Sequence, residues 1–192
     1  MTVLILGLLL FLGIHSVRIV AEPARQRFIA QRGEGPWKGL YSLVSAVGLG
    51  LIIWGYGLAR QQPVVLWQPL PGMAHLAALL TLVAFVLIAA GNVPRNAIKA
   101  RLRHPMMLGT KVWAFAHLLA NNTLADVRLF GGFLVWSILG YRAARRRDGP
   151  QPAPLDAGTP ERTGMIAGAG VLAWLAFAFW LHGPLIGVRP LG

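Results

Sequence analysis

Long apolar runs constrain this chain more than any other feature of its sequence. Residues 1–20 are almost continuously apolar, and as an α-helix they would reach across the ~30 Å hydrocarbon core of a bilayer. Lipid offers no hydrogen bonds to a backbone, so a run of this kind must be helical. Six such runs predict an all-α, polytopic membrane helix bundle with six transmembrane helices. The predicted spans are residues 1–20, 40–58, 74–90, 106–120, 124–141 and 165–181.

The composition supports a membrane protein. Charged residues make up 12% of the chain and hydrophobic residues 56%, whereas a soluble domain carries about a quarter charged residues. The sequence has no cysteine, which excludes disulfides, thiolate metal sites and cysteine nucleophiles. We therefore expect the lipid bilayer as the main partner of the chain, with any chemistry left to other side chains.

Basic residues gather on one side of the predicted bundle. Fourteen lysines and arginines fall in the connections after the first, third and fifth spans, against three on the other side. The positive-inside rule then places both termini outside the cytoplasm. In this setting the net charge of +12 reflects topology and contact with anionic head groups, and we expect no nucleic-acid partner.

The apolar runs divide the chain into three parts. Residues 1–141 form a five-helix membrane domain, in which residues 22–38 read as a short basic connection with Gly and Pro breakers. Residues 142–164 are first basic and then rich in Pro, Gly and small residues, which predicts a mobile cytoplasmic linker. Residues 165–192 contain the sixth span and a short tail.

Two histidines lie well inside predicted spans. His15 and His117 must be desolvated in an apolar setting, so each needs a partner within the protein. Measured from the cytoplasmic ends, His117 lies deeper than His15, but tilted helices can bring both imidazoles to a common level. Facing imidazoles in a helix bundle can ligate haem iron; alternatively, both rings are structural and bonded to carbonyls or hydroxyls. His75, His104 and His182 lie at helix ends, where the interface explains them.

The neighbours of these histidines suit a haem. Trp113 and Phe11 precede His117 and His15 by four residues, so an aromatic ring can accompany each ligand. Several basic side chains toward the cytoplasmic side can meet haem propionates. They are Arg18, Arg101, Arg103 and Lys111. A zinc site is less well supported, because the few carboxylates lie in loops or at helix ends.

Several segments resemble the NnrU family of bacterial membrane proteins. The similarity extends to about Trp136 and includes the segment from His117 to Asn121. The four other segments are Tyr41-Ser-Leu-Val-Ser, Trp54-Gly-Tyr-Gly-Leu-Ala-Arg60, Pro63-Val-Val-Leu-Trp67 and Ile98-Lys-Ala-Arg-Leu-Arg-His-Pro-Met. NnrU proteins are associated with nitrite and nitric oxide reductase expression, and are related to a plastid zeta-carotene isomerase that uses haem b.

The resemblance implies a site and a function. His15-Ser16 and Ala116-His117-Leu118 resemble histidine motifs of that isomerase, which makes His15 and His117 the favoured axial and catalytic pair. His104-Pro105 resembles a third motif, with His104 as the reserve ligand. Arg18, Arg103 and Trp113 would complete the cofactor site.

Two functions follow as expectations from the resemblance. The first is a haem b protein of the bacterial inner membrane, a redox-dependent or cis–trans isomerase-type enzyme linked to denitrification. Its substrate would be lipophilic or linked to nitrogen oxides. The alternative is a non-enzymatic accessory or assembly factor for nitrite and nitric oxide reduction, with membrane-protein partners docking on its loops.

Overall fold

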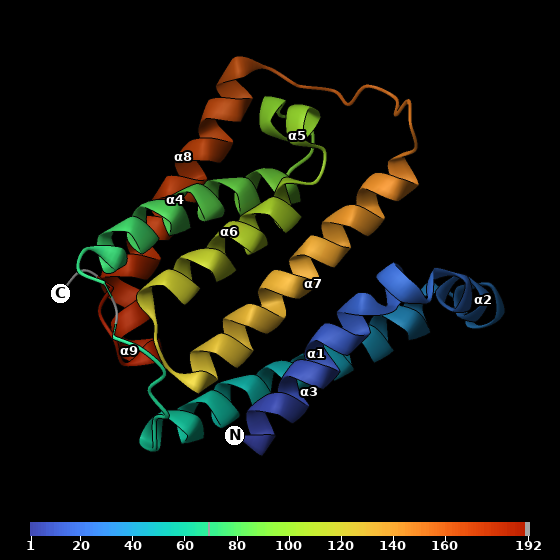
Figure 1. Cartoon of the computed structure of the whole chain (residues 1–192). Coiled ribbons are helices and arrows are strands. Elements are labelled where there is room, and N and C mark those ends of the chain that lie inside the picture. The colour runs from blue at the N-terminus through green and yellow to red at the C-terminus, as the bar shows by residue number, and fades with distance from the viewer. Residues whose placement is uncertain (69, 191–192) are drawn as a thin grey trace.

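The computed structural model describes residues 1–68 and 70–190, and its regular elements are helices (Figure 1). Within these residues the only strand-like pairing is one isolated bridge between Val65 and Thr123. The all-α prediction is therefore confirmed. The helices are α1 (Thr2–Val20), α2 (Glu22–Arg32), α3 (Glu34–Gln61), α4 (Met73–Asn92), α5 (Ala97–Leu102), α6 (Pro105–Ala120), α7 (Leu124–Asp148), α8 (Pro160–Ala176), the π-helical turn η1 (Phe177–Leu181) and α9 (His182–Ile186).

Five segments of the described chain are long and apolar enough to cross a membrane. Four are the helices α1, α3, α4 and α7, and the fifth is the continuous segment Pro160–Ile186. All six predicted apolar runs are helical, but α6 has only 16 residues and is about 24 Å long at ~1.5 Å per residue. Length and composition thus support a multi-span membrane protein with five candidate spans.

The helices form two groups joined by α7 (Figure 1). The first group is the α1–α3 pair, and the second is α4 with α6 and α8. Gly7 permits the close approach of α1 to α3, because a Cβ there would lie 2.6 Å from the backbone nitrogen of Ile52. Gly109 does the same between α6 and α4, where a Cβ would lie 2.8 Å from the carbonyl oxygen of Ala84. Within the described residues, α3 packs against neither α4 nor α6.

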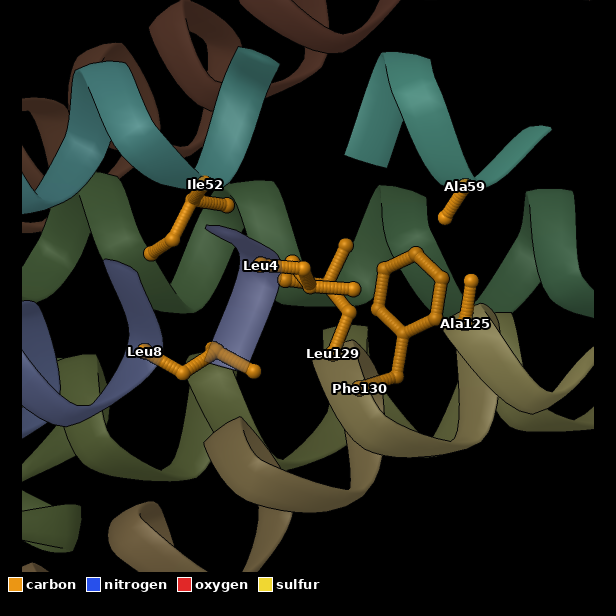
Figure 2. Packing of buried hydrophobic residues seen from close by; sticks show 7 residues of the cluster. All are labelled: Leu4, Leu8, Ile52, Ala59, Ala125, Leu129 and Phe130. Atoms are coloured by element: carbon orange, nitrogen blue, oxygen red, sulfur yellow. The ribbon is translucent and has the colours of Figure 1, made fainter. Parts of the chain in front are cut away.

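The hydrophobic core lies where α1, α3 and α7 meet, near the N-terminus. Figure 2 shows Leu4 of α1 pointing toward Leu129 of α7, and Ile52 of α3 and Phe130 of α7 belong to the same buried cluster. Leu4 is fully buried, and burial of a leucine contributes about 1.5–3 kcal/mol. This core fixes α7 to the α1–α3 pair at one end of the molecule.

Hydrogen bonds also hold α3 and the loop after it to α7 and the turn before it at that same end, which we call the terminal end because Met1 and α9 lie there (Figure 1). The Tyr56 hydroxyl of α3 donates to Asp126 Oδ1 of α7 at 2.6 Å. Asp126 is buried and completes a capping box with Thr123 at the start of α7. The loop after α3 also bonds to the α6–α7 turn, through Leu66 N to Asn122 O at 2.8 Å.

The opposite end, here called the basic end, carries α2, α5 and the end of α7 (Figure 1). The predicted connection 22–38 is instead helical over most of its length. Pro23 occupies the first turn of α2, where its missing N–H costs nothing, and Glu22 bonds to Arg25 and Gln26. Gly33, with φ of +87°, separates α2 from α3. The breakers therefore act only at the ends of α2.

The predicted linker 142–164 is also shorter than expected. Helix α7 continues to Asp148 and α8 begins at Pro160, which leaves residues 149–159 between them. This segment contacts α5 and its approach, through Asp156 with Arg95 at 3.3 Å. Helix α8 then packs against α4, where Trp174 Nε1 donates to Thr81 Oγ1 at 3.0 Å. The sixth apolar helix is therefore part of the same bundle.

Candidate functional site

A cavity of about 770 Å³ lies between the two helix groups at the basic end. This volume is in the range of cofactor and small-molecule sites, about 300–1,000 Å³. Helices α1 and α3 line one side, the end of α4 and the start of α6 line another, and α7 contributes residues from Trp136 to Asp148. Its charged lining residues are Arg18, Arg25, Lys38, Lys99, Arg103, Arg147, Glu34 and Asp148.

His15 projects from α1 and lines this cavity. Its Nδ1 lies 2.7 Å from the carbonyl oxygen of Phe11. A carbonyl only accepts, so Nδ1 carries the proton and donates, and the lone pair is on Nε2. The ring stacks on Phe11 at 4.2 Å and lies 4.9 Å from the ring of Tyr41. These contacts hold an imidazole whose Nε2 lone pair can coordinate a metal.

His104 lines the same cavity from the start of α6. Its Nε2 lies 3.0 Å from Asp148 Oδ2 and donates to it. Asp148, the last residue of α7, also accepts from Arg103 Nε at 2.9 Å. The carboxylate is well covered, with a side chain 14% exposed. A carboxylate that orients one ring nitrogen leaves the other available, which is the usual support of a metal-ligating histidine.

Trp136 supplies an unpaired donor at the cavity. Its indole Nε1 is buried and has no hydrogen-bond partner among the described residues. A buried donor without a partner costs about 1–3 kcal/mol. Trp136 therefore lies in the cavity wall with one hydrogen bond unmade.

His117 has similar local bonding but lies elsewhere. Its Nδ1 donates to the carbonyl oxygen of Trp113 at 2.9 Å, and its ring stacks on Phe130 at 4.5 Å. His15 instead lies against Trp136, six residues further along α7 and so about 9 Å away along the helix axis. The two rings are therefore at different levels of the bundle.

Aromatic side chains occupy the space between His15 and His117. Phe133 of α7 lies 5.8 Å from Phe11, which stacks on His15. Phe133 also lies 5.5 Å from Trp113, which is beside His117. These rings form a continuous row from one histidine to the other, so the two imidazoles do not face one another directly.

The cavity brings together four of the six residues predicted for the cofactor site. His15, His104, Arg18 and Arg103 line it, whereas His117 and Trp113 do not. The pairing of His15 with His117 as axial ligands stays a prediction, and it would require the intervening rings to move.

The sequence analysis missed several lining residues. Asp148 lies in the predicted linker, and Tyr41 and Trp136 were not among the predicted site residues. Lys99 was one basic loop residue among several. Only the observation that Asp148 directly follows a run of arginines could have suggested its role.

Fold and site together define a multi-span, all-α membrane protein with a histidine-lined, basic cavity. The family model described as NnrU protein matches residues 3–190, so the chain belongs to the NnrU family. The match continues beyond Trp136 and includes the last helix. No curated protein and no solved structure matches the chain.

Proposed function

We propose that this protein binds haem b in the cavity at the basic end and acts as a redox-dependent or cis–trans isomerase-type enzyme. The cavity carries the proposal, because it combines two histidines with six cationic side chains. Its setting would be the bacterial inner membrane and nitrite or nitric oxide reduction, as its family suggests.

The donor set fits a haem. His15 offers Nε2 and His104 offers Nδ1, each with the other nitrogen held by an acceptor. His15 and His104 are therefore the first pair to test as axial ligands, and His117 remains the second ligand favoured by the sequence. The cationic rim can pair with propionates, as arginine and lysine do with carboxylates. When bound, haem would be held by these histidines and would supply an iron that can change oxidation state.

The protein's own residues would orient and shield the bound group. The carbonyl of Phe11 fixes the ring of His15, and Asp148 fixes the ring of His104. Apolar side chains of the wall, such as Ile14 and Met107, exclude water and suit a lipophilic substrate. A cis–trans isomerisation changes no atom count, so it needs no second substrate in this cavity.

We also propose six spans with both termini in the periplasm. Helix α6 lies beside α4 in antiparallel orientation, with Met106 against Gly91 and Gly109 against Ala84. A helix that accompanies a span in this way crosses much of the same bilayer thickness, with tilt or local thinning taking up the difference. The connections at the basic end hold fourteen cationic residues, and this excess supports a cytoplasmic location for that end.

The test is a reduced-minus-oxidised absorption spectrum of purified protein, with a pyridine haemochrome assay. We expect near-stoichiometric haem b in the natural sequence and in His75→Ala, an exposed position at the other end. His15→Ala should lose most haem, and His104→Ala and His117→Ala identify the second ligand. A colourless protein after expression with ample haem would contradict the proposal and favour an accessory factor.

A further inference from the structure

Two cations of the cavity have no acidic partner. Lys99 Nζ donates to the carbonyl oxygen of Gly91 at 2.8 Å, and Arg147 Nη1 donates to the carbonyl oxygen of Arg18 at 3.1 Å. Within the described residues, neither forms an ion pair with a carboxylate. The other lining cations do: Arg18 and Arg25 with Glu22, Lys38 with Glu34, and Arg103 with Asp148.

Lys99 is held in place by its own short helix. Asn96 caps α5, accepting from Lys99 N at 2.7 Å, and its amide nitrogen donates to the carbonyl oxygens of Ala90 and Val93. Asn96 is fully buried, so this turn is rigid and presents Lys99 to the cavity. Arg147 reaches the same cavity from the end of α7. The unneutralised charge thus comes from two separate elements.

The helices that bound the cavity also expose apolar surface. Met106 of α6 lines the cavity and is still 40% exposed, and Trp37 of α3 lines it as well and is only partly buried. No described contact joins α3 to α4 or α6, so the helices leave the cavity uncovered between them. Positive charge beside exposed apolar surface is complementary to an amphiphile with an anionic head.

We propose that an anionic phospholipid of the surrounding leaflet binds at the mouth of the cavity. Its phosphate contacts Lys99 and Arg147, and its acyl chains lie against Met106 and Trp37. Inorganic phosphate would satisfy the charge but leave the apolar surface bare. Six cationic and two carboxylate side chains line the cavity. If a bound haem added its two propionates, positive charge would still be in excess, so the inference does not rest on haem.

Native mass spectrometry of the full chain in detergent tests this site, with phosphatidylglycerol and phosphatidylcholine titrated as competing probes. We expect selective retention of phosphatidylglycerol. Lys99→Gln and Arg147→Gln should each weaken it about fivefold, the effect of one cation near a lipid head group. The matched controls are Arg101→Gln and Arg146→Gln, exposed cations on the same helices that do not line the cavity. They should change retention less than twofold.

Lys99→Arg is the control for a general loss of structure on substitution. It keeps the charge, so it should still bind the lipid. Equal losses in the controls would mean that the whole basic face attracts lipid, and would overturn the site. Displacement of the lipid by millimolar inorganic phosphate would overturn the choice of a lipid. Haem content, measured on the same samples, reports on the proposed function separately, because lipid selectivity is expected with or without haem.

Discussion

The terminal end and the basic end of this bundle differ in how the two helix groups meet. At the terminal end a buried core and the Tyr56–Asp126 hydrogen bond join the first group tightly to α7, which packs on α6 of the second group. At the basic end a cavity separates the two groups, and the direct bond from α7 to α1 is the one between Arg147 and the Arg18 carbonyl. The tight core and the cavity, which is the proposed ligand site, thus lie at opposite ends, with α7 belonging to both.

In the proposed topology, the two ends lie on opposite sides of the membrane. Because the chain has no cysteine, a single introduced cysteine is the sole labelling site. We expect Arg27→Cys at the basic end to resist a membrane-impermeant maleimide in intact cells and to react after lysis. His75→Cys at the terminal end should react in intact cells. Labelling of both positions from the same side would contradict the six-span topology.

The largest loss of stability should come from the tight contact between α1 and α3. In Gly7→Val, the Cβ would meet the backbone of Ile52 at 2.6 Å, and a backbone cannot move aside as a side chain does. We expect destabilisation of about 3 kcal/mol, the upper part of the range for overpacking, measured by thermal unfolding in detergent. Gly13→Val is the control, because a Cβ at Gly13 meets no atom within 4 Å.

A smaller loss should follow when the hydrogen bond at the terminal end is removed. Tyr56→Phe keeps the ring but leaves buried Asp126 with one donor fewer. A bond to a charged group contributes about 1.5–3 kcal/mol, so we expect destabilisation of about 2 kcal/mol. Ligand binding at the distant cavity should stay unchanged. If Tyr56→Phe lost bound ligand but kept its stability, the roles given to the two ends would be wrong.

The sequence predicted the apolar helices, but it did not predict the helix α2 at the basic end. Apolar runs identified the helices, because burial in lipid requires continuous apolar residues and internal hydrogen bonds. The helical state of α2 was missed, since its Pro and Gly residues stand at helix ends, where they are tolerated. Charge counts separated the two ends, and the structure gathers α2, α5 and the end of α7 together (Figure 1).

The candidate site was less predictable for a geometrical reason. His15 could be singled out by its place in an apolar run, and the cavity does contain it. The level of His117 relative to His15 depends on how α6 and α1 pack on α7, which no local pattern specifies. The roles of Asp148 and Trp136 depend on contacts with residues far away in the sequence, such as the 3.0 Å bond to His104.

The smallest change should come from Asp148, which supports the cavity without adding to the core. In Asp148→Ala, His104 loses its acceptor and Arg103 loses its ion pair. Loss of a group that orients a metal ligand typically weakens metal binding about 10-fold or more, so we expect about tenfold weaker haem binding by titration of the apo-protein.

Trypsin should also cut Asp148→Ala faster after Arg147, because the end of α7 is freed. Asp156→Ala, which removes an exposed pair with Arg95, should do neither. Thermal unfolding of Asp148→Ala close to that of the natural sequence would show that the basic end binds while the terminal end stabilises, whereas a loss as large as that of Tyr56→Phe would show that both ends hold the bundle together.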